Sequence, residues 1–342
     1  MKRTKQPSSP LLVPSGSSLL DLACSDSIKG AFPLGKVVNI IGDSSAGKTM
    51  LALSMFAEMN DRIGFDNYKF IYDDVERALE FDVQNLFGEV SRRIEPPALD
   101  DDEKLYSDTI QDFFVNLKSW LNEGDPFIYV LDSFDALTSE QEEEKVDKFV
   151  KAHLKGEKSA GSYGMDKARM SSQILRMVKG LVADTDSLVV IISQTRDNID
   201  PFSFEKKKRS GGRALKFYSS HEIWLANKAK LKKKDRVIGN QVQAKVSKNK
   251  LTGKVRVVEF PVYYDYGVDS IGSAIDFLSK ERWKAKTKNK INAPEFEFEG
   301  SRQKLIDYIE INDSETELFG ILEDEWQEIE ESLKLNRKRK YD

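Results

Sequence analysis

The stretch Gly42-Asp43-Ser44-Ser45-Ala46-Gly47-Lys48-Thr49 constrains the fold more than any other part of this chain. It has the form G-x-x-x-x-G-K-[ST]. The apolar run 37–41 before it predicts a buried strand, and the run 50–57 after it predicts a helix. Such a unit directs several backbone N–H groups and the positive end of a helix dipole at one point, which suits a triphosphate. The alternative, a loop that only turns the chain, does not explain the flanking strand and helix.

Composition indicates an ordinary globular protein of 342 residues, 39% hydrophobic and 32% charged, with a net charge of −4. No apolar run reaches the length of a membrane span, and none follows the basic start Met1–Gln6 as it would in a signal peptide. The single cysteine, Cys24, excludes an internal disulfide and indicates a reducing compartment, for which we expect the cytoplasm. Having only His153 and His221 argues against a histidine-based metal site.

Strand-like apolar runs alternate with helical patterns over most of the chain. We predict strands at 37–41, 68–72, 127–131 and 188–192, and helices near 49–61, 75–87, 108–122 and 166–184. This alternation is typical of an α/β fold with a mostly parallel central sheet covered on both faces. The segments 220–226, 241–248 and 254–262 predict antiparallel edge strands. Helices at 301–311 and 314–334 predict a small α+β C-terminal domain that begins near Val268.

Three polar strand ends suggest a catalytic site. The apolar strand Phe127–Leu131 ends in Asp132, a carboxylate suited to hold Mg²⁺ near the Thr49 hydroxyl, although such an Asp can also cap a turn. Glu76 follows the strand 68–72, and we interpret it as the base that accepts a proton from water; a solvent-facing Glu at a helix start is the alternative. The amide of Gln194 ends the fourth strand, where it can sense a terminal phosphate.

Two segments beside these strand ends carry cations. The loop Thr195–Gly212 contains Arg196 and the run Lys206–Arg209, and a long basic loop can order when a polyanion arrives. The stretch Lys155–Gly164 is rich in Gly and Ser and precedes Arg169 and Arg176, which a spacing of seven puts on one helix face. That face could meet successive phosphates, or it could simply be solvated.

Several segments together resemble the RecA-type recombinases over roughly residues 15–335. These segments are Pro14–Asp21, the loop 42–49, Asp74–Leu79, Val130–Leu137, Ala168–Gln173, Ser193–Arg196, Gly211–Tyr218 and Lys248–Lys250. The last two are the most specific, because P-loop ATPases of other kinds lack that combination. The resemblance implies an N-terminal arm at 1–30, a RecA-like P-loop ATPase core with two DNA-binding loops at 31–267, and a small C-terminal domain with a basic tail at 268–342.

The resemblance also implies the cofactors ATP and Mg²⁺ and a role for each matching residue. Lys48 and Thr49 would bind phosphates and metal, and Asp132 and Ser133 would order the metal shell. Glu76 would activate water, and Gln194 would couple the terminal phosphate to the loop Thr195–Gly212. Met50, Glu80 and Ser133 complete the predicted nucleotide-binding set.

The remaining implied contacts involve a second subunit and DNA. Lys248 and Lys250 would reach the ATP held by a neighbouring subunit, and Phe217 would pack across the same boundary. Ile199 would wedge between bases, and glycine N–H groups would hold phosphates. The implied DNA contacts are Met165, Arg169, Ser172, Arg176, Arg196, Ile199, Gly211, Gly212 and Arg213.

Four features depart from the family pattern. Only fourteen residues precede Ser15, where a polymerisation helix and strand are usual, and Asp197 replaces an apolar loop residue. Val83 stands where an aromatic ring normally stacks on adenine, so we expect looser base selectivity. The tail Arg337–Lys340 is basic where bacterial relatives are acidic, so it should not restrain DNA binding. These departures suggest a divergent, phage-encoded member.

We therefore expect a DNA-dependent ATPase that forms helical homo-oligomeric filaments on single-stranded DNA, pairs that strand with homologous double-stranded DNA and exchanges strands, with no membrane partner. One alternative is a ring-forming motor of the same fold, such as a helicase; residues 211–218 and the small C-terminal domain argue against it. Another is a mediator that binds ATP but barely hydrolyses it, against which Lys48, Glu76 and Asp132 argue.

Overall fold

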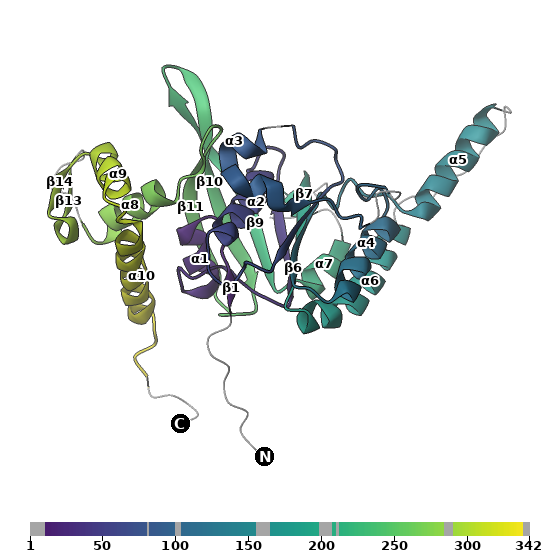
Figure 1. Ribbon diagram of the computed structural model, residues 1–342, viewed down its shortest axis with the longest axis horizontal. Coiled ribbons are helices and arrows are strands. Elements are labelled where there is room, and N and C mark those ends of the chain that lie inside the picture. The colour runs from purple at the N-terminus through teal and green to yellow at the C-terminus, as the bar shows by residue number, and fades with distance from the viewer. Residues whose placement is uncertain are drawn as a thin grey trace, which may run out of the picture.

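A ten-stranded sheet forms the centre of the computed structural model (Figure 1), which describes residues 11–80, 82–99, 104–154, 165–197, 207–209, 212–283 and 290–337. The strand order is β12-β11-β10-β9-β3-β7-β6-β4-β5, with β8 paired to β7. The parallel strands are β3 (Lys36–Gly42), β4 (Lys69–Asp74), β5 (Ile94–Glu95), β6 (Phe127–Asp132), β7 (Leu188–Asp197) and β9 (His221–Lys233). This arrangement confirms the predicted α/β fold with a mostly parallel sheet.

Two hydrophobic clusters cover the two faces of the sheet. Alternate residues of one strand enter different clusters: Val130 of β6 packs in the first and Tyr129 in the second. The first cluster includes helix α2 (Lys48–Asn60), and the second includes α4 (Ile110–Glu123) and α6 (Met165–Asp184). Double-sided burial explains why the middle residues of β3, β4, β6 and β7 are mostly apolar, and the predictions of strands at 37–41, 68–72, 127–131 and 188–192 are confirmed.

The predicted helix at 75–87 is wrong over most of its length. Residues 75–80 form a turn and an irregular segment, and the short helix α3 begins only at Val83 and ends at Phe87, before the 3-10 turn η1 (Gly88–Arg93). The Asp74 carboxylate accepts hydrogen bonds from the N–H groups of Ala78 and Leu79, both at 3.1 Å, and Arg77 has a left-handed φ of +53°. These local bonds replace the helical ones, so Glu76 lies on a loop.

The predicted antiparallel strands form one long meander with a parallel start. β9 runs parallel to β3 from Val38↔His221 to Gly42↔Leu225, which corrects the expectation that 220–226 is an antiparallel edge. On its other side β9 pairs antiparallel with β10 (Arg236–Asn249), which is followed by the antiparallel strands β11 (Arg256–Tyr263) and β12 (Gly267–Val268). β9 and β10 extend well beyond β3 and form a projecting hairpin (Figure 1).

Residues 11–30, the described part of the predicted arm, pack on the core. β1 (Leu12–Val13) pairs with β2 (Phe32–Pro33), and the buried helix α1 (Ser18–Ser25) lies against β11 and the C-terminal helix α8 (Ser270–Glu281). After α8 come β13 (Ile291–Ala293), η2 (Pro294–Phe296), β14 (Phe298–Gly300), α9 (Arg302–Ile311) and α10 (Glu315–Ser332). The helices predicted at 301–311 and 314–334 are present, while the domain boundaries at 30 and 267 stay a prediction.

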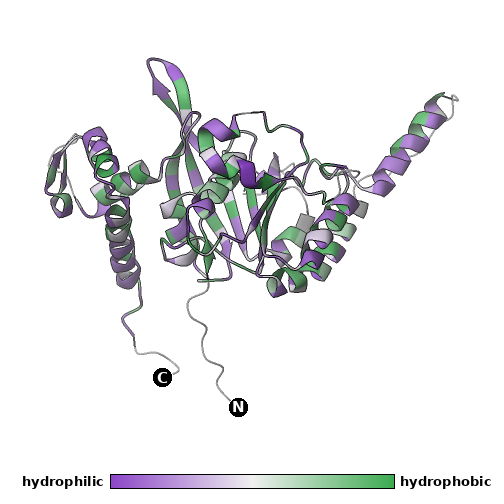
Figure 2. Cartoon of the chain, viewed as in Figure 1, coloured by the Kyte–Doolittle hydropathy of each residue, from purple (hydrophilic) through white to green (hydrophobic). Residues whose placement is uncertain are grey.

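Helices α1, α5 (Glu140–Leu154), α7 (Gly212–Tyr218) and α8 were not expected from the sequence, and α5 is the longest of them. Helix α5 extends away from the sheet on the side of α4 and α6 (Figure 1), with charged and apolar residues interspersed along it (Figure 2). Its many charged residues hide the periodicity of Val146, Phe149, Val150 and Leu154, which are all exposed. Within the described residues, no helix combines the length and apolar character that crossing a membrane requires.

Candidate functional site

The predicted phosphate-binding loop, residues 42–49 and called the P-loop below, joins the end of β3 to the start of α2. Gly47 immediately precedes α2 with a φ of +86°, a left-handed conformation that favours glycine. Lys48 is only 9% exposed, and its ammonium donates hydrogen bonds to the carbonyls of Gly42 at 3.0 Å and Asp43 at 2.7 Å. Burial lowers its pKa from the usual value for lysine. The loop thus places the Lys48 ammonium beside the N-terminus of α2, and both favour a bound anion.

Thr49 and Asp132 meet beside this loop. The Thr49 hydroxyl donates a hydrogen bond of 2.6 Å to the Asp132 carboxylate, which also accepts one of 2.7 Å from the Tyr72 hydroxyl. Burial raises the pKa of Asp132. A hydroxyl and a single carboxylate fit Mg²⁺, which usually takes one or two protein oxygens and completes its shell with water and substrate phosphates. Among the described residues, no group of three or more His, Cys, Asp or Glu side chains forms a fuller metal site.

Glu76 lies at the centre of a second group of hydrogen bonds. Its carboxylate accepts hydrogen bonds from the Ser133 hydroxyl and, at 2.9 Å, from the Gln194 amide nitrogen. Glu76 follows β4, Ser133 follows β6, and Gln194 lies near the end of β7. The carboxyl ends of these neighbouring parallel strands therefore bring the three residues together. The exposed carboxylate of Glu76 is held in place and remains accessible to a water molecule.

The P-loop also contacts the start of the basic loop directly. The Asp43 carboxylate accepts a hydrogen bond from the Thr195 hydroxyl and pairs with the Lys207 ammonium, which lowers the pKa of Asp43. Lys207 belongs to β8 (Lys207–Arg209), which pairs antiparallel with the end of β7. The described ends of the basic loop therefore form a ribbon attached to the P-loop, a link that the sequence analysis did not anticipate.

Asp135 was missed as well, although it follows the predicted acidic strand end by three residues. Its carboxylate accepts the backbone N–H of Gln194 at 2.5 Å, and burial raises its pKa. Lys167 of α6 donates to the carbonyl oxygens of Asp135 and Leu137 at 3.2 and 2.5 Å. Asp135 thus positions the residue that contacts Glu76.

A cavity of about 460 Å³ opens beside the P-loop and the start of α2. Its apolar wall includes Leu86 of α3, while Val83 lies outside the lining, and Glu80 is exposed on the loop before α3. The β9–β11 meander supplies the opposite wall, which sequence reasoning missed because the pairing of distant strands is not visible in local patterns. The complete lining is Ser45, Gly47, Lys48, Thr49, Met50, Leu86, Lys230, Asn240, Val262, Tyr263 and Tyr264.

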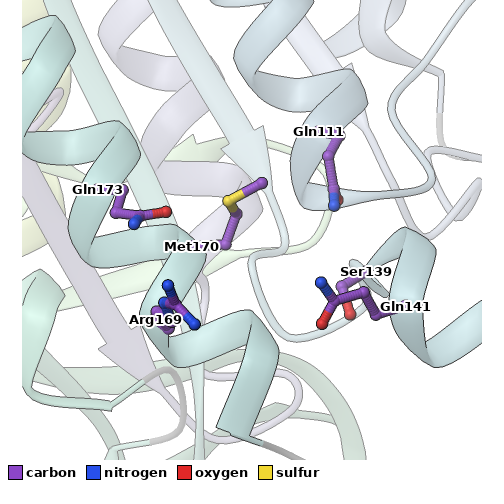
Figure 3. A pocket seen from close by; sticks show the side chains of 6 residues that line it. All are labelled: Gln111, Ser139, Gln141, Arg169, Met170 and Gln173. Carbon is purple, nitrogen blue, oxygen red and sulfur yellow. The ribbon is translucent and has the colours of Figure 1, made fainter.

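Arg169 and Arg176 are both exposed on α6, as their spacing predicts, and Ser172 is half-buried between them. Arg169, Met170 and Gln173 face Gln111 of α4 and the start of α5 across a small pocket of about 190 Å³ (Figure 3). Met165 is the first residue of α6. The stretch 155–164 lies outside the described residues.

The predicted contacts of the second loop are only partly described. Arg196 is exposed near the end of β7, opposite Lys208 of β8. Gly212 and Arg213 begin helix α7 (Gly212–Tyr218), whereas Ile199 and Gly211 lie outside the described residues. Arg209 forms a buried ion pair with Glu222 of β9, which fixes the returning end of this loop against the core.

Lys248, Lys250 and Phe217 lie near the amino ends of the parallel strands, whereas the P-loop lies at their carboxyl ends. Asn249 pairs with His221 near the amino end of β3, so Lys248 is about 27 Å along β10 from Asn240 at the cavity. The Lys248 ammonium donates to the carbonyls of Lys216 and, at 3.2 Å, Phe217 at the end of α7, and burial lowers its pKa. Lys250 is exposed, and Phe217 is 72% exposed.

Comparison with known proteins identifies the family. The model of the RecA N-terminal domain matches residues 5–269. Protein RecA of Lactobacillus delbrueckii subsp. bulgaricus is 30% identical over 271 residues, which cover 79% of this chain and 73% of that protein. Protein RecA 2 of Myxococcus xanthus is 31% identical over 271 residues, with coverage of 79% and 68%. Because the match continues through the P-loop, the acidic strand ends and the basic loop, this chain belongs to the RecA family of recombinases.

Proposed function

We propose that this protein binds ATP and Mg²⁺ at the P-loop, polymerises on single-stranded DNA, pairs that strand with a homologous duplex and hydrolyses ATP to turn over. One observation carries the proposal: Gln194, which bonds to Glu76, and the exposed Arg196 are two residues apart on β7. A single strand end therefore connects the residues suited to hydrolysis with the residues suited to DNA. The cytoplasmic and phage assignments stay predictions.

Each part of the nucleotide site has a chemical task in this proposal. Lys48 and the N–H groups of the P-loop bind phosphate oxygens, while Thr49 and Asp132 hold Mg²⁺, which neutralises phosphate charge when bound. Glu76 takes a proton from the attacking water, and Ser133 and Gln194 orient its carboxylate. Gln194 also responds to the terminal phosphate, since its side chain is at the site and its backbone leads into the basic loop.

The location of Lys248, Lys250 and Phe217 supports assembly of identical subunits. These residues lie at the end of the parallel strands opposite the P-loop, so they can meet only the nucleotide of another molecule. A contact between two different surfaces of the same protein is heterologous, and it generates an open helix unless the rotation closes into a ring. A filament with ATP at each subunit boundary is the arrangement that we propose.

Affinity for a labelled oligonucleotide, measured by fluorescence anisotropy with ATPγS and with ADP, tests this proposal. We expect binding between about 5- and 150-fold tighter with ATPγS, the usual range for coupled sites. Equal affinities would refute it. Phosphate release that single-stranded DNA does not accelerate would favour the mediator, and closed rings in electron micrographs would favour the ring motor.

Arg196→Ala is expected to weaken DNA binding and to flatten its salt dependence. An exposed arginine that neutralises one phosphate contributes about one unit to the slope of log K against log salt concentration. Anisotropy titrations over a range of salt concentrations measure this slope. Arg92→Ala is the control, because Arg92 pairs with Glu89 on η1 outside the basic loop. An unaltered slope would remove Arg196 from the DNA path.

Asp43→Asn should reduce the difference in DNA affinity between the ATPγS and ADP states. The change removes the charge that pairs with Lys207 but keeps an oxygen that can accept from Thr195. Both ion-pair side chains are nearly half exposed, so we expect a two- to fivefold effect, which corresponds to at most about 1 kcal/mol. The control is Asp61→Asn at the end of α2. A ratio equal to that of the unmodified protein would argue against this link.

A further inference from the structure

Lys167 is a half-buried cation in the first turn of α6, and the contacts of its ammonium all lie on one short segment. The ammonium donates hydrogen bonds to the carbonyl oxygens of Asp135 at 3.2 Å and Leu137 at 2.5 Å, and it lies 4.9 Å from the centre of the Phe134 ring. Burial lowers the pKa of Lys167, and the positive end of a helix dipole disfavours a cation there as well. The lysine therefore occupies a costly position, which these three contacts compensate.

The segment that this lysine holds, called the turn segment (residues 133–137), also holds both donors that orient Glu76. Ser133 begins the segment and donates directly to the Glu76 carboxylate. Asp135 accepts the backbone N–H of Gln194 at 2.5 Å, and the side-chain amide of Gln194 donates to Glu76 at 2.9 Å. A displacement of the turn segment would therefore move both partners of the proposed base.

Gln194 gives this site two discrete arrangements. In the structure its amide donates to Glu76, and in the proposed function the same amide can donate to the terminal phosphate instead. The position of the Gln194 backbone biases this choice, and Asp135 fixes that backbone through its N–H group. Burial raises the pKa of Asp135, whereas this hydrogen bond and the positive charges of Lys167 and Arg196 lower it. Two segments with predicted DNA contacts, α6 and the end of β7, thus act on one carboxylate.

Arg169 connects Lys167 to the surface where we expect DNA. The two residues are two positions apart on α6, a spacing that puts them on different sides of a helix, and Arg169 is exposed while Lys167 faces the turn segment. Arg169 lies at the pocket between α6 and the start of α5 (Figure 3). Helices in regulated proteins shift as units by about 1–2 Å. A phosphate that binds Arg169 and shifts α6 would therefore displace Lys167 and the turn segment together.

We infer that Lys167 and Asp135 are positioning residues that transmit DNA binding on α6 to Glu76, by a connection separate from the basic loop. DNA displaces the first turn of α6, Lys167 moves the turn segment, and Asp135 moves the backbone of Gln194. The Gln194 amide then leaves Glu76 for the terminal phosphate. A carboxylate that loses a donor is a stronger base, so hydrolysis accelerates while Ser133 still orients Glu76. This inference rests on the proposed function, because it needs ATP at the P-loop and DNA at α6.

The test measures phosphate release by the full chain with Mg²⁺ and ATP, with and without single-stranded DNA, and takes the ratio of the two rates as the DNA acceleration. We expect Lys167→Met to lower this ratio at saturating DNA by about 3- to 30-fold, the usual range for residues between coupled sites. The DNA concentration that gives half of the acceleration should stay within about twofold, because the Lys167 ammonium contacts the turn segment. The control is Lys179→Met, an exposed lysine about three turns further along α6, which should leave both quantities unchanged.

Two further variants test where the connection begins and ends. Arg169→Ala should lower the DNA acceleration, and adding Lys167→Met to it should lower the ratio by less than about twofold more, because the two residues act in series. Asp135→Asn removes the negative charge that attracts Lys167 and keeps an oxygen for the Gln194 N–H group, so it should also lower the ratio. This variant leaves α6 intact and decides the question if Lys167→Met does not fold, which thermal melting of each variant shows.

Each other outcome overturns the inference in a distinguishable way. A DNA acceleration that Lys167→Met leaves unchanged removes the lysine from the connection, and one that Asp135→Asn leaves unchanged removes the carboxylate. Equal losses of the rates with and without DNA would mean that Lys167 only supports the fold, and a loss that more DNA restores would make it a DNA contact. Additive losses with Arg169→Ala would mean that the two residues act separately. If DNA does not accelerate hydrolysis by the unmodified protein, the proposed function itself is wrong.

Discussion

Lys48→Ala is expected to abolish ATP hydrolysis, with turnover reduced by at least about 100- to 1000-fold, the usual cost of removing one group that stabilises transition-state charge. The Lys48 ammonium is the cation of the P-loop itself: it is buried and bonds to the carbonyls of Gly42 and Asp43. The other lysine of the cavity, Lys230, is exposed on the projecting hairpin. A steady-state phosphate-release assay with saturating single-stranded DNA measures the effect.

Lys36→Ala is the matched control for this variant. Lys36 lies on β3, the strand that precedes the P-loop, at its exposed amino end, whereas Lys48 is the first residue of α2. The control should hydrolyse ATP at the rate of the unmodified protein. If Lys48→Ala did so too, the P-loop assignment would be wrong.

Glu76→Gln should lower hydrolysis by about 100- to 10,000-fold, which is the usual contribution of a general base. The replacement keeps the length of the side chain and an oxygen that can accept from Ser133 and Gln194. We therefore expect ATP affinity to stay within about twofold and DNA affinity with ATP to remain that of the triphosphate state. Single-turnover phosphate release measures the rate of hydrolysis, and displacement of a fluorescent ATP analogue measures the affinity for ATP.

Glu89→Gln on η1 is the control here, because Glu89 is an exposed acid on the same connection and pairs with the nearby Arg92. Equal losses of hydrolysis and ATP binding in Glu76→Gln would mean that Glu76 supports the fold of the loop rather than activates water. Unchanged hydrolysis would exclude Glu76 as the base.

The parts of this structure that were predictable from the sequence are those that local chemistry determines. The middle residues of β3, β4, β6 and β7 are mostly apolar because both faces of the sheet are covered, and the glycine loop before Lys48 is diagnostic by its residues alone. The group of Glu76, Ser133 and Gln194 follows from one topological rule, that parallel strands end at one edge.

The remaining features depend on contacts between segments that are distant in the sequence. The helix expected at 75–87 fails because the Asp74 carboxylate binds the N–H groups that would have continued it. The pairing of Asp43 with Lys207 joins residues far apart in the chain, and Asn240 reaches the cavity only through the register of β9, β10 and β11. Hydrophobic periodicity contains no information about such pairings, whatever window is used.

The P-loop and Lys248 lie at opposite ends of the strands of one sheet, which has a consequence for any polymer of this protein. Every row of subunits stacked through these two surfaces would have direction: one terminal molecule would present a nucleotide cleft with no lysines facing it, and the other would present lysines with no nucleotide to meet. The two ends of the polymer would then gain and lose subunits at unequal rates. ATP turnover would be slowest in the terminal molecule whose nucleotide cleft no neighbouring subunit covers.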